Sequence, residues 1–189
     1  MRIIGGEARG RQIRLPRGCR IRPTADRVKE SLFNILHPLE GASFLDMFAG
    51  CGNCGLEALS RGAGRAVFLE KEPRLAEAIR ENLRLLGFEG RGEVIAADAG
   101  QGVRRLAKRT ERFDVLFADP PYDEGFLPEI MKWLGEADLL ADGGLIVLQH
   151  SVREALEGSC VKAMAMADQR RYGDTVLSFL KKHAKAENP

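Results

Sequence analysis

The chain has 189 residues, of which 44% are hydrophobic and 30% are charged, a size and composition that fit one globular domain. No apolar run approaches the roughly 20 residues of a membrane-spanning helix, and the first residues lack the apolar stretch of a signal peptide, so we expect a cytoplasmic protein. Four cysteines in such a chain indicate reduced thiols rather than a disulfide framework.

The formal net charge of +2 is unevenly distributed along the chain. Residues 1–30 hold nine basic and three acidic side chains, a local charge of +6, which leaves −4 for the other 159 residues. This asymmetry favours contact between the N-terminal segment and a polyanion, although a solvated surface would also explain it. Arginine predominates over lysine there, as suits bidentate contacts with phosphate and stacking on bases.

Residues 1–22 are predicted to form a basic arm. Short apolar runs alternate with glycines over residues 2–16, a pattern typical of a β-hairpin that is too small to fold alone. The main domain is predicted to span residues 23–182, and residues 183–189 to form a frayed tail. Its first helix is expected to begin with Thr24 as the N-cap and to bury Val28, Leu32, Phe33, Ile35 and Leu36.

Apolar strands and amphipathic helices alternate from Ser43 onward. The predicted strands cover residues 44–48, 66–70, 93–97, 113–118 and 145–149, and the predicted helices cover 56–61, 73–86, 101–108 and 125–134. Repeated βα units of this kind favour an α/β fold with a doubly wound, mostly parallel sheet. Two further strand-like runs, 161–166 and 175–180, leave no room for a full helix between them, so we expect this last pair to be antiparallel.

A glycine-rich loop follows the first predicted strand. Gly50, Gly52 and Gly55 have the Gly-x-Gly-x-x-Gly spacing that lets the backbone approach a cofactor at the carboxyl end of a strand. Glu70 closes the second strand, 20 residues after Gly50, where an acid can accept hydrogen bonds from ribose hydroxyls. NAD would fit these features equally well.

Two aspartates favour a different cofactor. Asp46, in the turn itself, would repel a pyrophosphate but would attract the ammonium or sulfonium group of S-adenosylmethionine. Asp98 closes the third strand, where methyltransferases often place an acid against the adenine amine. The predicted cofactor site comprises Asp46, Phe48, Gly50, Gly52, Gly55, Glu70, Lys71, Asp98, Ala99 and Asp119.

The fourth strand runs into Asp119-Pro120-Pro121-Tyr122, which we predict to be catalytic. The tetrapeptide resembles the Asp/Asn-Pro-Pro-Tyr/Phe motif of amino-methyltransferases. Asp119 and the Pro120 carbonyl can accept hydrogen bonds from an exocyclic amine, whose lone pair is otherwise delocalised, and can aim that lone pair at a methyl group. The two prolines fix the backbone, and Tyr122 offers a face for an extruded base. A rigid surface turn is the simpler reading of the same four residues.

The cysteines and histidines predict no metal centre. Cys51 and Cys54 have the spacing of a redox or metal pair, but neither Cys19 nor Cys160 belongs to a second pair, so we expect small thiols that fill the glycine loop. His150 is interpreted as a strand-end residue near the cleft. No cysteine lies in the loop after the fourth strand, which excludes the covalent mechanism of cytosine-C5 methylation.

Taken together, the motifs resemble the RsmD-like family of bacterial small-subunit (16S) ribosomal RNA guanine-N2 methyltransferases. The segments that carry the resemblance are residues 5–11, 22–34, 46–63, 119–122 and 172–179. The resemblance implies a Rossmann-like class I fold that depends on S-adenosylmethionine and has seven strands, the last one antiparallel. It also implies ribosomal RNA as the partner, either naked or assembled with ribosomal proteins in the small subunit. It places Arg22 and Thr24 over the cofactor and the target pocket. The expected RNA contacts are Arg2, Arg9, Arg11, Arg22, Thr24, Arg27 and Tyr122.

Several alternatives remain open from the sequence. A DNA or RNA adenine-N6 methyltransferase would use the same tetrapeptide, although the chain has no region left for a separate target-recognition domain. A protein glutamine-N5 methyltransferase would more often have asparagine at position 119. A non-catalytic RNA-binding assembly factor could retain the fold without turnover. We expect a monomer.

Overall fold

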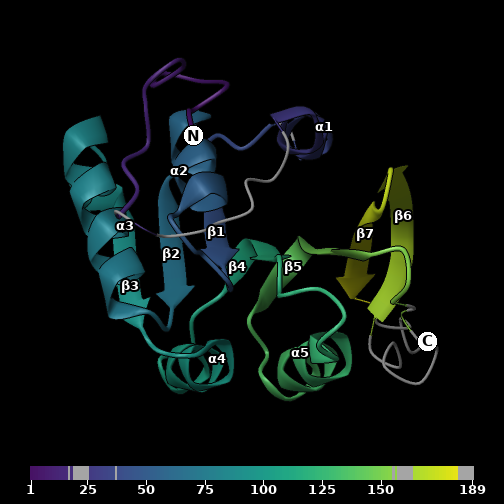
Figure 1. Cartoon of the computed structure of the whole chain (residues 1–189). Helices are drawn as coiled ribbons and strands as arrows, with labels where there is room; N and C mark the ends of the chain where they lie inside the picture. Colours follow the sequence, from purple (N-terminus) through teal and green to yellow (C-terminus); the bar gives the residue numbers. More distant parts are fainter. Residues whose placement is uncertain (17, 19–25, 37, 155, 157–163, 183–189) are drawn as a thin grey trace.

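A seven-stranded sheet forms the centre of the computed structural model, which describes residues 1–16, 18, 26–36, 38–154, 156 and 164–182 (Figure 1). The strands lie in the order β3-β2-β1-β4-β5-β7-β6. Strands β1 to β5 are parallel, and β7 is antiparallel to both of its neighbours, β5 and β6. Their bounds are β1 Ser43–Asp46, β2 Arg65–Glu70, β3 Gly92–Ala96, β4 Phe113–Ala118, β5 Leu140–Ser151, β6 Met164–Tyr172 and β7 Thr175–Lys182. The predicted doubly wound sheet with an antiparallel C-terminal pair is confirmed.

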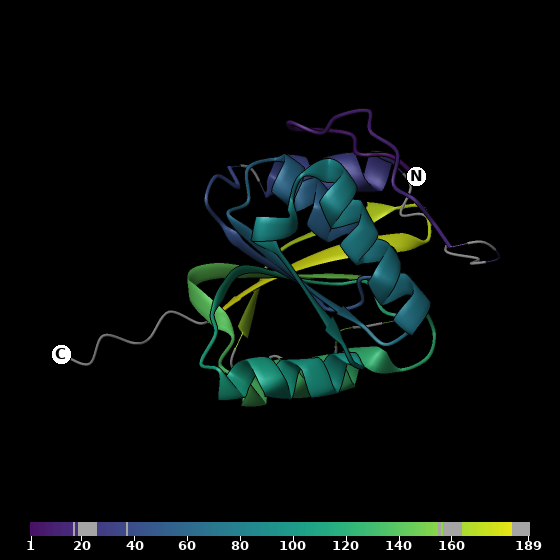
Figure 2. The same ribbon diagram turned by 90° about the vertical axis from the view of Figure 1, so that its left-hand side faces the viewer.

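Helices cover both faces of this sheet (Figure 2). One face packs against α1, α2 and α3, and the opposite face packs against α4 and α5, so the sheet separates two apolar clusters. The apolar side chains of β2 and β4 are buried, as expected for parallel strands with helices on both sides. The helices are α1 Asp26–Ile35, α2 Asn53–Ser60, α3 Pro73–Leu86, α4 Ala99–Lys108 and α5 Phe126–Glu136, with a 3-10 turn, Glu89–Arg91, after α3.

Local sequence signals explain where the helices begin and end. Helix α3 has Pro73 at its first position and Gly87, with φ +79°, directly after its last residue, and both of its predicted ends are confirmed. Asp98 caps α4, since its Oδ1 accepts a hydrogen bond of 2.9 Å from the backbone N–H of Gln101. The predicted burial of Ile35 is wrong. Ile35 is 38% exposed because the buried side of α1 consists of Val28, Lys29, Leu32 and Phe33.

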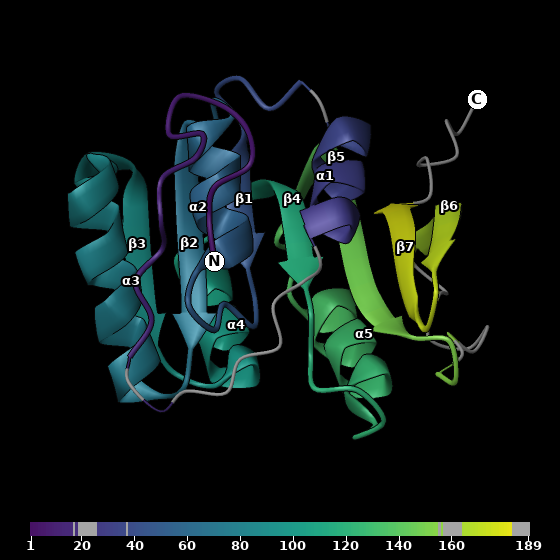
Figure 3. The same ribbon diagram turned by 45° about the horizontal axis from the view of Figure 1, so that its top comes forward.

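The N-terminal arm, residues 1–16, lies along α2 and α3 (Figure 3). Its antiparallel pairing is limited to one bridge, Arg2 with Gln12, supported by backbone hydrogen bonds between Ile3 and Arg11 and between Gly10 and Ile3. The arm is attached through three buried side chains, Ile3, Ala8 and Ile13. It is therefore part of the same apolar cluster as the helices beneath it. The predicted domain boundaries at residues 22 and 183, and the proposed N-cap Thr24, lie outside the described residues.

No helix within the described ranges combines the length and the apolar character that a membrane crossing requires.

Candidate active site

Four acidic residues meet at the carboxyl edge of the parallel sheet. Asp46 is the last residue of β1, Glu70 is the last of β2, and Asp119 directly follows β4. Asp98 comes two residues after the end of β3. The register confirms their proximity, because Asp46 pairs with Phe117 of β4 and Glu70 pairs with Ala96 of β3. The structure therefore brings the predicted cofactor-binding acids together at one end of adjacent strands.

The shape of the glycine loop depends on two of these acids. Glu70 Oε2 accepts a hydrogen bond of 2.7 Å from the N–H of Gly50, and Asp46 Oδ2 accepts one of 3.1 Å from the N–H of Gly55. Gly50 and Gly52 have φ angles of +55° and +83°, which disfavour other residues. At Gly55 a β-carbon would lie 2.2 Å from the ring of Phe68 in β2, so only glycine permits this approach of helix and strand.

Asp46 is the most perturbed acid of the site. Asp46 is 1% exposed, and its Oδ1 has no hydrogen-bond partner among the described residues. Burial raises the pKa of Asp46 to about 7, the Gly55 N–H opposes that rise, and the negative charges of Asp119 and Glu70 add to it. A buried, unpartnered acceptor among three carboxyl groups suits a cationic ligand. The ammonium and sulfonium groups of S-adenosylmethionine supply such charge.

This pKa predicts that cofactor binding depends on pH. A cation beside Asp46 favours its ionised form, so binding lowers the pKa from about 7 and releases a proton. Affinity for S-adenosylmethionine is then expected to rise with pH from 6 to 8, by at most about tenfold per unit below the free pKa. Calorimetric titration in buffers of different ionisation enthalpy measures the protons released. Uptake of protons, or a pH-independent affinity shared by Asp46→Asn, would contradict this role.

The other predicted cofactor-binding residues lie at the same edge. Glu70 Oε1 accepts a hydrogen bond from the backbone N–H of Glu72, so both carboxylate oxygens of Glu70 are hydrogen-bonded to backbone N–H groups. A ribose hydroxyl would therefore donate to the remaining lone pairs of these oxygens. Phe48 is half-buried, with its ring edge-on to Phe126 of α5 at 5.7 Å. Lys71 is exposed, and Ala99 is the buried first residue of α4.

The tetrapeptide at residues 119–122 turns away from the end of β4. Pro120 is buried, Asp119 and Tyr122 are half-buried, and Pro121 is exposed. The Tyr122 hydroxyl accepts a hydrogen bond of 3.0 Å from Gln149 Nε2 in β5. It also lies 3.5 Å from the hydroxyl of Thr175, the first residue of β7. Burial, followed by the charge of Asp119, raises the pKa of Tyr122, which keeps its hydroxyl protonated.

Sequence reasoning missed Gln149 and Thr175. The only sequence signal was a polar pair, Gln149-His150, inside the apolar run of β5. His150 itself is buried and hydrogen-bonded by both nitrogens, at 2.9 Å to the Ser151 carbonyl and 2.8 Å to the Ser178 hydroxyl, so its polar atoms are used within the sheet.

The two thiols of the glycine loop are buried and free. Burial raises the pKa of Cys51 to about 11 and raises that of Cys54 well above its ordinary value. Both groups therefore remain protonated at neutral pH, and a thiolate, the form that binds metals and reacts with disulfides, is disfavoured. Among the described residues no group of three or more histidine, cysteine or acidic side chains could hold a metal ion. Cys19 and Cys160 lie outside those residues.

The predicted RNA-binding arginines are exposed where they are described. Arg2 forms an ion pair of 3.4 Å with Asp26, and the Arg11 guanidinium donates to the Leu85 carbonyl. Arg9 and Arg27 are exposed. Arg22 and Thr24 lie outside the described residues. Lys29, one of the basic residues counted in the N-terminal segment, is not on the surface. It is buried and forms an ion pair with Glu57.

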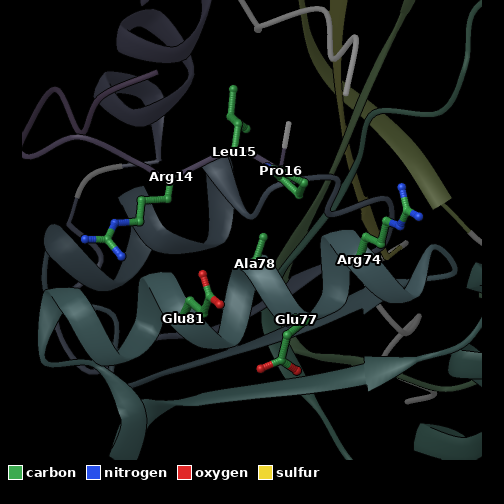
Figure 4. Close-up of a pocket in the computed structure, with 7 residues that line it drawn as sticks. All are labelled: Arg14, Leu15, Pro16, Arg74, Glu77, Ala78 and Glu81. Atoms are coloured by element: carbon green, nitrogen blue, oxygen red, sulfur yellow. The ribbon is translucent and has the colours of Figure 1, made fainter. Parts of the chain in front are cut away.

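A groove of about 460 Å³ separates the end of the arm from α3 (Figure 4). Arg14 and Arg74 lie toward opposite ends of it, and the floor includes Ala78, Glu77 and Glu81. The two glutamates would repel a phosphate chain, so we assign this groove no part in the site.

The strand order, the glycine loop and the acids at the carboxyl edge define a Rossmann-like class I methyltransferase, the class that uses S-adenosylmethionine as its methyl donor. The family model described as "Conserved hypothetical protein 95" matches residues 1–181. The chain therefore belongs to this family, the RsmD-like family.

Individual relatives match along most of their length. Ribosomal RNA small subunit methyltransferase D of Escherichia coli is 39% identical over 157 residues, which cover 82% of this chain and 77% of that protein. YlbH of Bacillus subtilis is 36% identical over 183 residues, 96% of this chain and 99% of that one. The solved structure of yhhF from Escherichia coli has a TM-score of 0.83 and 33% identity, and the match covers 96% and 97% of the two chains.

Proposed function

We propose that this protein transfers a methyl group from S-adenosylmethionine to the exocyclic N2 amine of a guanine in small-subunit ribosomal RNA. The observation that carries the proposal is the position of Asp119-Pro120-Pro121-Tyr122 directly after β4, beside the buried Asp46 at the cofactor edge. Methylation of ribosomal RNA is also what the name of the similar Escherichia coli protein states. The preference for guanine N2 comes from the family resemblance.

The chain's own residues have separable roles in this reaction. Bound S-adenosylmethionine supplies the electrophilic methyl group. Asp119 and the Pro120 carbonyl accept hydrogen bonds from the target NH2 group, which holds its lone pair toward the donor and favours the positive charge that develops on nitrogen. The Tyr122 ring provides a stacking surface for the base. The proton released afterwards passes to Asp119 or to water, so no strong base is needed.

Ribosomal RNA is the proposed partner of the arm, as naked RNA or within the assembled subunit, and we propose that one copy of the chain acts alone in the cytoplasm. Support for an RNA contact comes from the exposed Arg2, Arg9, Arg11 and Arg27, on the arm and on the adjacent helix α1. Arginine suits a partner whose phosphates and bases both need contacts.

The arm predicts a salt-dependent affinity. The double variant Arg9→Gln/Arg27→Gln is expected to bind the RNA substrate about tenfold more weakly at moderate salt. The slope of log affinity against log salt concentration should also become less negative by about 1.4 to 1.8, because two phosphate contacts are lost. A matched control, Arg104→Gln/Lys132→Gln, removes two exposed charges from α4 and α5 on the other face of the sheet. Equal slopes for both double variants would contradict an RNA contact at the arm.

Methyl transfer tests the proposed function directly. The protein is incubated with methyl-labelled S-adenosylmethionine and small ribosomal subunits from a strain that lacks its own family member, and the RNA is digested to nucleosides. We expect the label in N2-methylguanosine. Label in N6-methyladenosine would support the adenine alternative, and label in DNA or protein alone would overturn the RNA assignment.

A further inference from the structure

A buried polar contact links the tetrapeptide at residues 119–122 to the C-terminal half of the sheet. Gln149 lies in β5 and is 4% exposed, and its Nε2 donates to the Tyr122 hydroxyl at 3.0 Å. Thr175 reaches the same hydroxyl at 3.5 Å from β7. These two strands pair with each other in antiparallel register, Gln149 with Leu177 and Ser151 with Thr175. The hydroxyl therefore contacts two adjacent, hydrogen-bonded strands of the sheet.

The burial of Gln149 is unfavourable by itself. The two residues before it in β5, Val147 and Leu148, are apolar and buried, and its own Oε1 has no hydrogen-bond partner among the described residues. Burying an amide with one unsatisfied atom costs free energy that a leucine or methionine of similar volume would not cost. Because its amide donates to the Tyr122 hydroxyl, packing alone does not explain a glutamine here.

We propose that Gln149 is a positioning residue for methyl transfer: with Thr175 it holds the Tyr122 hydroxyl and so fixes the ring against which the target base stacks. This inference rests on the proposed function. The prolines restrict the backbone on one side of Tyr122, and the hydrogen bond restricts the far end of its side chain. Two fixed points determine where the ring lies relative to Asp119. Gln149 is too deeply buried to touch the base and acts through the tyrosine.

A double-mutant cycle tests this role. Gln149→Leu and Tyr122→Phe each remove the contact, so each is expected to lower kcat for RNA methylation about three- to tenfold. The affinity for S-adenosylmethionine should not change. The double variant should be no slower than the slower single variant, because Tyr122→Phe already removes the hydroxyl that Gln149 contacts. Thr175→Val should show a smaller loss of the same kind. Multiplying effects, or full activity in Gln149→Leu, would overturn the proposal, and Gln101→Leu on the outside of α4 serves as the control.

A second readout does not need activity. The chain has two tyrosines, so incorporation of 3-fluorotyrosine gives one fluorine NMR signal for Tyr122 and one for Tyr172, whose hydroxyl contacts Ser31. Gln149→Leu should shift and broaden the Tyr122 signal alone. Unchanged signals would overturn the anchoring role even if the wild-type protein methylated no RNA. Conversely, a wild-type protein without methyl transfer but with the expected shift would overturn the proposed function and retain the contact.

Discussion

Replacing Asp119 by alanine is expected to lower kcat for methyl transfer about 10²–10³-fold, a loss typical of removing one hydrogen-bonding group that stabilises transition-state charge. Asp119 directly follows β4 and is half-buried beside the cofactor edge. Alanine removes both the acceptor and the charge. Asp119→Asn keeps a carbonyl acceptor and is expected to lose less activity. Initial rates with saturating RNA and S-adenosylmethionine measure both losses.

The ordering of the two variants separates hydrogen bonding from charge. If asparagine is as slow as alanine, the charge on Asp119 outweighs its acceptor geometry. Asp123→Asn, four residues further along, is a matched control because Asp123 is exposed and lies 3.8 Å from Arg153. An alanine variant that retains more than half of the wild-type kcat would remove Asp119 from the proposed mechanism.

Lys29→Met is expected to destabilise the fold by about 3 kcal/mol, near the lower end of the range for breaking a buried ion pair. The side chains of Lys29 and Glu57 are 1% and 0% exposed, and their charged atoms lie 3.2 Å apart. Lys29 Nζ also donates to Asn53 Oδ1 and to the Arg2 carbonyl, both at 2.8 Å. The ammonium group thus joins the arm, α1 and the glycine loop. Urea unfolding measures the loss.

Glu57 keeps two partners in this variant, which is why a loss at the lower end is expected. Its Oε1 remains 2.7 Å from Arg61 Nε, and its Oε2 still accepts from the backbone N–H of Ile4 at 2.8 Å. The double variant Lys29→Met/Glu57→Gln should lose more stability than Lys29→Met, because it also removes the carboxylate that pairs with Arg61. A Lys29→Met protein within about 0.5 kcal/mol of wild type, the range of ordinary surface substitutions, would show that the pair contributes little.

The alternation of strands and helices could be predicted because apolar periodicity and end signals agreed, as at Pro73 and Gly87 of α3. The start of β5 could not be predicted from the sequence. The sequence Asp142-Gly143-Gly144 has the composition of a turn, yet the strand continues through it from Leu140, with an irregularity opposite β4 and φ +76° at Gly143. Pairing with β4 therefore outweighed the local preference of these residues for a turn.

The candidate site was predictable only as far as chain position determines it. Acids that end parallel strands must lie at one edge, so Asp46, Glu70 and Asp119 could be grouped from sequence. Contacts between distant segments could not be grouped in this way. Gln149 reaches Tyr122 from 27 residues away, and Lys29, counted among the basic residues of the N-terminal segment, is neutralised by Glu57 in the interior. Periodicity identifies a buried face but not the polar partner that shares it.

The central claim is that the site beside Asp46 and Asp119 methylates guanine N2 in small-subunit RNA. The most direct test expresses the wild-type chain or Asp119→Ala in a bacterial strain deleted for its own family member and quantifies modified nucleosides in the small-subunit RNA by mass spectrometry. We predict that the wild-type chain restores the missing N2-methylguanosine and that the equally expressed variant does not. Restoration by both proteins, or by neither, would contradict the account.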